Sequence, residues 1–340
     1  MKERSKYFKW LLVVAGLTAL LLVAVLISLS TGELKIGLGE ALRLLFAGGD
    51  ESSLEHMLIS QVRLPRIMLG VAVGGALSLA GVMLQGIYRN PLVEPFTLGI
   101  SGGASLGVAF TIVLGLHQKL GAFALPLSGF LGAFLIIFLV YTLSSRRGNI
   151  NIQHMLLTGV MVSFVASSAM MFLMAVSSTE NLHGIVFWIM GSLDEPDTRL
   201  VWLTLIVTLL VLFISYLFVQ PLNALRLGEE KALHLGINTH VAIKALFLLA
   251  SLLAGICVAV AGVIGFVGLI IPHVLRLFLG TDYRILLISS FLLGGSFLVL
   301  SDVVARTIIS PNELPIGVIT GIIGGVVFIL LMSRKMRKGM

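Results

Sequence analysis

Long apolar segments recur along this chain and restrict it to a fold embedded in a membrane. A helix needs about 20 apolar residues to cross the hydrocarbon core of a bilayer. Ten such segments follow one another, at 10–30, 65–88, 96–116, 120–143, 154–178, 200–220, 241–263, 264–280, 284–308 and 315–333. Because lipid cannot satisfy backbone polar groups, each segment is expected to be a helix. The pattern therefore predicts an all-α polytopic membrane protein with about ten transmembrane helices.

The composition excludes several other classes of protein. Of the 340 residues, 58% are hydrophobic and 11% are charged, whereas a soluble domain carries about 25% charged residues. A disordered chain and a folded basic domain that binds nucleic acid are both excluded. The segment 10–30 could be a signal peptide, but its apolar run is too long and no A-x-A cleavage site follows, which favours an uncleaved span. We expect a single transmembrane domain over residues 1–340.

Charge is distributed unevenly between the connections of this ten-span arrangement. The pieces assigned to the inside, including both termini, hold 16 of the 23 Lys and Arg residues but only five of the 16 Asp and Glu residues. Cytoplasmic loops carry an excess of Lys and Arg, so both termini are predicted to be cytoplasmic. An even number of spans agrees. The boundary inside 241–280 is the hardest to place, and the glycines of 262–268 allow a reversal at the membrane surface.

Glycine makes up 37 residues and often recurs at a spacing of four. The pairs and triplets are Gly70 and Gly74; Gly99, Gly103 and Gly107; and Gly317, Gly321 and Gly325. Such spacing lets the backbones of membrane helices approach closely. We interpret it as tight packing, and a smooth wall along which helices slide is the alternative.

Catalytic and energy-coupling motifs are absent from the sequence. It has no G-x-x-x-x-G-K-[ST] motif, so no P-loop for ATP, and no G-x-S-x-G or H-E-x-x-H motif. We interpret His273 as a helix-end residue bonded to a neighbouring helix rather than a ligand of haem or metal, and Cys257 as a small buried residue. No acidic residue lies at a predicted midplane, which disfavours a secondary carrier. That carrier and a membrane-embedded enzyme remain as alternatives, and no cofactor is expected in this chain.

Four long motifs carry a resemblance to a known family. They are RLPRIMLGVAVGGALSLAGVMLQGIYRNPLVEPFTLGISGGASLG at 63–107, ALRLGEEKALHLGIN at 224–238, GFVGLIIPHVLRLFLGTDYRILL at 265–287 and SDVVARTIISPNELPIGVITGIIGG at 301–325. In order and spacing they resemble the FecCD/BtuC-like permeases for iron chelates and cobalamin, the membrane subunits of type II ABC importers. The resemblance implies a multi-pass permease in a bacterial or archaeal cell membrane. Its implied cargo is an iron complex, most commonly a siderophore, with cobalamin or haem as alternatives.

The resemblance also implies the partners of the chain. They are a second permease copy or a sibling permease, two cytoplasmic ATPase subunits that hold ATP and Mg, and an external substrate-binding protein. Arg63, Arg66 and Arg306 lie on the outer side in the predicted topology, against the usual bias of basic residues. They match outward arginines that dock glutamates of the binding protein in the family. Snorkelling, or contact with lipid headgroups, is the other interpretation.

Residues 221–240 form the longest polar insertion on the predicted cytoplasmic side. Two short amphipathic pieces are expected there, broken at Gly228 and ended at Gly236. The resemblance implies that this segment couples the permease to the ATPase, whereas the simpler interpretation is a solvated loop. The candidate coupling residues are Leu225, Arg226, Leu227, Gly228, Glu229, Glu230, Lys231, Ala232, Leu233, Leu235 and Gly236.

The turn after the second span is a candidate inner gate. Pro91 lacks an N–H and ends a helix cleanly, so a simple stop signal is one interpretation. The resemblance implies that Asn90 and Leu92 close the inner mouth of a transport pathway. Ile152 and Gln153 occupy the corresponding place before the fifth span, where the local similarity is weaker.

Overall fold

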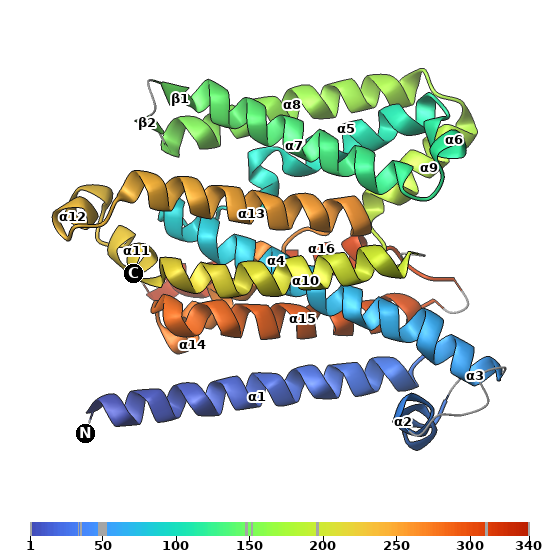
Figure 1. Cartoon of the computed structure of the whole chain (residues 1–340), viewed down its shortest axis with the longest axis horizontal. Helices are drawn as coiled ribbons and strands as arrows, with labels where there is room; N and C mark the ends of the chain where they lie inside the picture. The colour runs from blue at the N-terminus through green and yellow to red at the C-terminus, as the bar shows by residue number, and fades with distance from the viewer. Residues whose placement is uncertain are drawn as a thin grey trace.

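The computed structural model describes residues 2–32, 34, 36–46, 53–146, 149–150, 152–194, 197–309 and 312–338. These parts form a bundle of long helices that run in roughly the same direction (Figure 1). One short antiparallel hairpin, β1 (Ser145–Arg146) with β2 (Asn149–Ile150), connects two of the helices. The predicted all-α fold is confirmed.

Ten apolar helices correspond one by one to the ten predicted spans. Seven helices of the described part are long and apolar enough to cross a membrane: α1 (Lys2–Ser30), α4 (Leu64–Tyr88), α7 (Ala124–Ser144), α8 (Ile152–Ala175), α10 (Thr198–Ser215), α13 (Thr239–Ala261) and α15 (Tyr283–Thr307). Three have shorter apolar stretches: α5 (Ile100–Val113), α14 (Val267–Leu279) and α16 (Ile316–Lys338). The predicted boundaries differ from the observed ones by a few residues.

Both termini lie at the same end of the bundle, at the left in Figure 1. We call this the terminal end and the other the opposite end. The terminal end carries β1, β2, η3 (Tyr216–Phe218), α11 (Val219–Leu225) and α12 (Glu229–His234). The opposite end carries α2 (Leu38–Phe46), α3 (Leu54–Met57), η1 (Leu58–Arg63), α6 (Leu116–Leu120) and α9 (Thr179–Met190). The remaining short helix, η2 (Pro95–Leu98), precedes α5.

Polar residues begin several of the helices. Ser178, Asp197, Asn238 and Asp282 each accept a hydrogen bond from a backbone N–H of the first turn that follows. These first-turn N–H groups have no partner inside the helix, so a side-chain cap stabilises each start. The caps fix where α9, α10, α13 and α15 leave the loops.

The long apolar stretch 241–280 breaks where the glycines predicted a reversal. α13 ends at Ala261, and Gly262 follows with φ of +68°, where a Cβ would lie 2.4 Å from the carbonyl oxygen of Trp188. Residues 262–265 carry no helix, and α14 begins after Phe266, itself left-handed at φ +69°.

The depth of this break differs from the prediction. Gly268 packs against Gly81, which lies about 26 Å along α4 from its first residue. α14 therefore starts inside the bundle rather than at the membrane surface. Irregular backbone is tolerated at membrane depth only where protein or a water-filled cavity surrounds it.

α4 lies at the centre of the bundle and contacts α10, α13, α14 and α15. The contacts are close because glycines face backbone: a Cβ on Gly74 would lie 2.3 Å from the carbonyl oxygen of Gly294. Tight packing therefore explains Gly74, whereas Gly321 faces open space. Cys257 is buried on α13, and His273 of α14 contacts the Phe328 ring of α16, with ring centroids 6.4 Å apart.

Candidate functional sites at the two ends of the bundle

Arg63 caps the C-terminal end of α1, the first long helix. Its side chain is buried, and its guanidinium donates hydrogen bonds to the carbonyl oxygens of Leu29 and Leu34. Leu29 lies in the last turn of α1, whose carbonyl groups have no partner inside the helix. This contact pins η1 against α1 and directs the Arg63 side chain inward.

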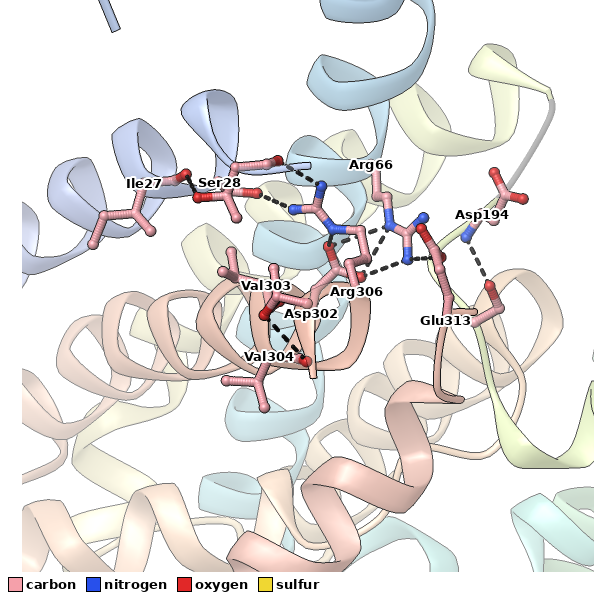
Figure 2. Close-up of polar contacts among 12 residues, drawn as sticks. Ile27, Ser28, Arg66, Asp194, Asp302, Val303, Val304, Arg306 and Glu313 are labelled. Carbon is pink, nitrogen blue, oxygen red and sulfur yellow. Dashed lines mark hydrogen bonds and ion pairs between the residues drawn. The ribbon is translucent and has the colours of Figure 1, made fainter. Parts of the chain in front are cut away.

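Arg66 and Arg306 share one carboxylate, that of Asp302 on α15 (Figure 2). The Arg66 Nε lies 3.0 Å from Asp302 Oδ1 and 3.2 Å from Oδ2. The Arg306 Nε lies 2.9 Å from Asp302 Oδ2, as an ion pair without hydrogen-bond alignment. Arg306 also donates from Nη2 to Ser28 Oγ at 2.8 Å and from Nη1 to the Thr31 carbonyl at 3.1 Å. The cluster therefore ties α1, α4 and α15 together.

Glu313 is the half-exposed member of this cluster. Its side chain is 48% exposed, and its Oε2 lies 2.8 Å from the Arg66 Nη2. A cavity of about 160 Å³ beside it is lined by Arg63, Arg66, Arg306 and Glu313 among other residues. The three arginines predicted to dock a partner thus gather around one cavity at the opposite end. Their guanidiniums are already engaged by this chain, and among the carboxylates that engage them Glu313 is exposed whereas Asp302 is buried.

The candidate gate turn is held by its own backbone. Asn90 Oδ1 accepts a hydrogen bond from the N–H of Leu92 at 3.0 Å, which forms a local turn around Pro91. Arg89, with φ of +49°, ends α4 in the left-handed conformation. The Leu92 side chain is exposed and so is only partly packed against the rest of the chain.

The second half of the candidate gate, Ile152 and Gln153, forms the start of α8. Ile152 packs partly against the main core, and Gln153 is exposed. α8 contacts η2, which follows the Leu92 turn, and a Cβ on Gly159 would lie 2.9 Å from the Leu98 Cα. The structure thus links the two halves through η2.

Of the two amphipathic pieces predicted in the coupling segment, the second forms the helix α12, whereas Arg226 and Leu227 of the first form a turn after α11. α11 ends at Leu225, α12 covers Glu229–His234, and Gly228 between them has φ of +111°, while Gly236 after α12 has φ of +80°. Of the five apolar candidates, Leu225 and Ala232 are buried in this chain. The exposed ones are Leu227, Leu233 and Leu235. Three leucines, not five apolar side chains, remain available to a partner.

The polar coupling candidates are placed as follows. Arg226 donates from Nη1 to the Thr281 carbonyl at 2.9 Å. Glu229 Oε1 lies 3.5 Å from Thr239 Oγ1, while Glu230 and Lys231 are exposed. Arg226 therefore fastens the segment to the loop between α14 and α15, and the outer face of α12 is charged.

The sequence as a whole matches one family. The model of the FecCD transport family matches residues 20–334. The chain belongs to the FecCD transport family. As a member of it, the chain is a multi-pass membrane permease.

Relatives of this FecCD-family permease are similar over nearly its whole length. It is 39% identical to the vitamin B12 import system permease protein BtuC of Klebsiella pneumoniae, over 99% of this chain and 97% of the relative. It is 38% identical to the ABC transporter permease protein YvrB of Bacillus subtilis (strain 168), over 94% and 92%. It is 36% identical to the hemin transport system permease protein HmuU of Yersinia pestis, over 94% and 96%.

Solved structures agree with the family assignment. A structure described as an inward-facing conformation of a metal-chelate type ABC transporter superposes with a TM-score of 0.83 at 33% identity, over 94% of this chain and 98% of the other. PsaBC of Streptococcus pneumoniae, in complex with a Fab, superposes with a TM-score of 0.52 at 16% identity, over 81% and 92%, and shares the fold alone.

Two acidic residues of the arginine cluster, Asp302 and Glu313, were not among the predicted site residues. Asp302 stands four residues before Arg306, a spacing that pairs opposite charges on a helix, so this signal was available. Arg66 is 236 positions from Asp302 and 247 from Glu313, and no local pattern reports such contacts.

Proposed function

We propose that this chain is the membrane-spanning permease subunit of an ABC importer that carries a metal chelate from an external binding protein into the cytoplasm. The observation that supports the proposal most strongly is the superposition on a metal-chelate type ABC transporter over 94% of the chain. The sequence has no P-loop, so two partner ATPase subunits supply the energy. A second permease copy, or a sibling, completes the pathway in a bacterial or archaeal cell membrane.

The proposed cargo is a ferric siderophore, and the second candidate is a tetrapyrrole complex. The second candidate is favoured by the relatives named for vitamin B12 and hemin, which cover almost all of this chain. All three cargoes are bulky chelates that enclose their metal. A pathway for them needs to be wide, with a wall that binds the cargo weakly. Specificity for the cargo then resides in the external binding protein.

The binding protein is proposed to dock at the opposite end, on the cavity lined by Arg63, Arg66 and Arg306. Glu313 holds Arg66 in the unbound permease. A carboxylate of the binding protein replaces Glu313 and forms a bidentate pair with the guanidinium. Such exchange sets the register and the rate of encounter more than the affinity.

At the terminal end, the exposed leucines of the coupling segment, Leu227, Leu233 and Leu235, are proposed to seat in the ATPase. Closure of the ATPases on ATP moves α12, and Gly228 is the hinge because only glycine tolerates its backbone conformation. The movement opens or closes the mouth at Asn90, Leu92, Ile152 and Gln153.

The test is the ATPase activity of the assembled importer in lipid nanodiscs. The permease is copurified with its ATPase and binding protein, and ferric siderophore, haem and cobalamin are offered separately. Stimulation by one class identifies the cargo. Uptake that follows an imposed ion gradient, without a copurifying ATPase, would instead establish the secondary carrier.

Docking is tested by a matched pair of acidic residues at the opposite end. Glu313→Ala removes the exposed carboxylate from the Arg66 Nη2, which keeps only Asp302 at 2.9 Å, and should speed association of the binding protein several-fold at low salt. Glu55→Ala removes an exposed acid at the same end and should leave the rate near wild type. Equal rates for both variants would contradict docking on Arg66.

A further inference from the structure

A second charged cavity lies at the terminal end, away from the docking cavity. It has a volume of about 360 Å³ and lies between the ends of α4 and α14, the start of α15 and the link between α11 and α12. Its polar lining residues, which define the basic pocket, are Gln85, Arg89, Arg226, His273, Arg276, Thr281 and Tyr283. Three arginines line it, and the lining contains no Asp or Glu.

Two acidic residues that lie close to the basic pocket in the chain are engaged elsewhere. Asp282, next to Tyr283, pairs with Lys6 Nζ at 3.1 Å and accepts a hydrogen bond from the Arg284 N–H at 3.1 Å. Glu229, which follows the Arg226 link, is directed toward Thr239. The positive charge of the basic pocket is therefore not balanced by these carboxylates.

Hydrogen bonds hold two of the three guanidiniums beside the basic pocket, and the third lies close by. Arg226 is anchored on the Thr281 carbonyl, and Arg89 Nη1 lies beside Gly228, 3.4 Å from where a Cβ would be. Arg276 donates from Nη1 to Gln85 Oε1 and also interacts with the Tyr283 hydroxyl, while the charge of Arg226 lies near it.

One donor in the basic pocket has no acceptor. The Arg276 Nη2 is buried and has no hydrogen-bond partner within the described part of the chain. A buried donor without an acceptor is costly, and so are like charges held together. An anion that accepts from Nη2 removes both costs at once.

We propose that the basic pocket binds a phosphate group, whose source is the headgroup of an anionic phospholipid or free phosphate. Arginine forks suit the tetrahedral oxygens of phosphate. The rim of the pocket favours the lipid, because Leu277 and the adjacent Phe278 are 59% and 80% exposed and offer an apolar surface for an acyl chain. Basic pockets between transmembrane helices on the cytoplasmic side suit anionic headgroups. The basic pocket is separate from the docking cavity, and one of its arginines, Arg226, also belongs to the coupling segment.

The experiment measures lipid retention by the full chain. The delipidated permease in detergent is titrated with phosphatidylglycerol, phosphatidylcholine or inorganic phosphate, and binding is followed by native mass spectrometry and by thermal stability. We expect phosphatidylglycerol to bind at least about tenfold more tightly than phosphatidylcholine, and Arg276→Gln to remove that preference. Binding of phosphate alone, also lost in Arg276→Gln, identifies free phosphate as the source.

Two further variants keep the test decisive if Arg276→Gln misfolds. Arg89→Gln alters an exposed residue of the basic pocket and should weaken binding of phosphatidylglycerol several-fold. Arg284→Gln, an exposed arginine at the same end that does not line the pocket, should leave it unchanged. The proposal is overturned if neither phosphate source binds, or if Arg284→Gln weakens binding as much as the pocket variants do.

Discussion

Asp302 is the residue on which the charge cluster at the opposite end depends. It is 2% exposed and lies between Arg66 and Arg306, whose side chains are 10% and 8% exposed. Paired burial of this kind adds little net stability, but removal of one partner leaves the others uncompensated. The cluster therefore fixes the geometry of three helices, and its loss has a large cost.

We predict that Asp302→Asn lowers the free energy of unfolding by about 3–5 kcal/mol, because two buried arginines lose their shared carboxylate. Unfolding in detergent, followed by intrinsic fluorescence against denaturant, measures the change. Glu313→Gln is the control, since Arg66 keeps Asp302 and an exposed pair contributes about 1 kcal/mol or less. Equal losses in the two variants would show that burial of Asp302 is unimportant.

Asp282 gives the terminal end a dependence on acid pH. Partial burial alone would raise the pKa of Asp282, but the Arg284 N–H and the Lys6 ammonium group outweigh it and hold the pKa below its ordinary value. A carboxyl with a lowered pKa stabilises the fold above its unfolded pKa, and this contribution is lost as the pH falls.

We therefore predict a small loss of thermal stability in the wild type as the pH falls below about 4, where the unfolded carboxyl starts to bind protons. In Asp282→Asn the contribution is absent at every pH, so the curve should be flatter. The difference between the two melting curves isolates Asp282 from other acids. A constant difference from pH 7 to pH 3 would contradict the assignment.

Among the helices, α4 and α14 approach each other very closely, backbone against backbone. A Cβ on Gly81 would lie 1.9 Å from the carbonyl oxygen of Gly268, and the atoms it would meet belong to the Gly268 backbone, which cannot move aside cheaply. Because α14 begins at this contact, the spacing of the two helices determines where the extended segment 262–265 enters the bundle.

We predict that Gly81→Ala destabilises the fold by several kcal/mol, because overpacking forces α14 away from α4. Gly321→Ala on α16 is the matched control, since a Cβ there meets nothing within 4 Å and alanine favours a helix. Thermal unfolding of both variants in the same detergent measures the contrast. A mild effect of Gly81→Ala would mean that the two helices separate easily.

The sequence predicted these helices well because their apolar length is a local property. It did not predict that α14 begins inside the bundle, since the residues on either side of 262–265 are equally apolar at any depth. Likewise, Leu225 and Leu233 look alike in the sequence, yet one is buried and the other exposed. Only tertiary contacts separate them.

For the whole molecule, the sequence predicted which segments lie at each end of the bundle. It did not predict the bonding partners of the site residues. Charge asymmetry and an even number of spans place the termini together, as observed. The prediction that Arg63, Arg66 and Arg306 share one end follows from the same topology. Their engagement by Leu29, Asp302 and Glu313 arises between segments far apart in the chain, which a single sequence does not report.

The topology can be tested with single cysteines, because the native Cys257 is buried. Lys231→Cys at the terminal end should react with a membrane-impermeant maleimide only in inside-out vesicles. Lys119→Cys at the opposite end should react only in cells whose outer surface is accessible. The unmodified chain, with Cys257 alone, should stay unlabelled in both. Labelling of both variants from the same face would refute the arrangement.

The central position of α4 has a mechanical consequence. Arg66 stands in its first turn, Gln85 of the basic pocket stands in its last, and the Asn90 turn follows directly. Its 25 residues form a rod of about 37 Å. Rocking such a rod by about 5° about one end displaces the other by about 3 Å. Under the function proposed above, a binding event at the opposite end reaches the Asn90 turn as the tilt of one lever, without a relay of side chains between them.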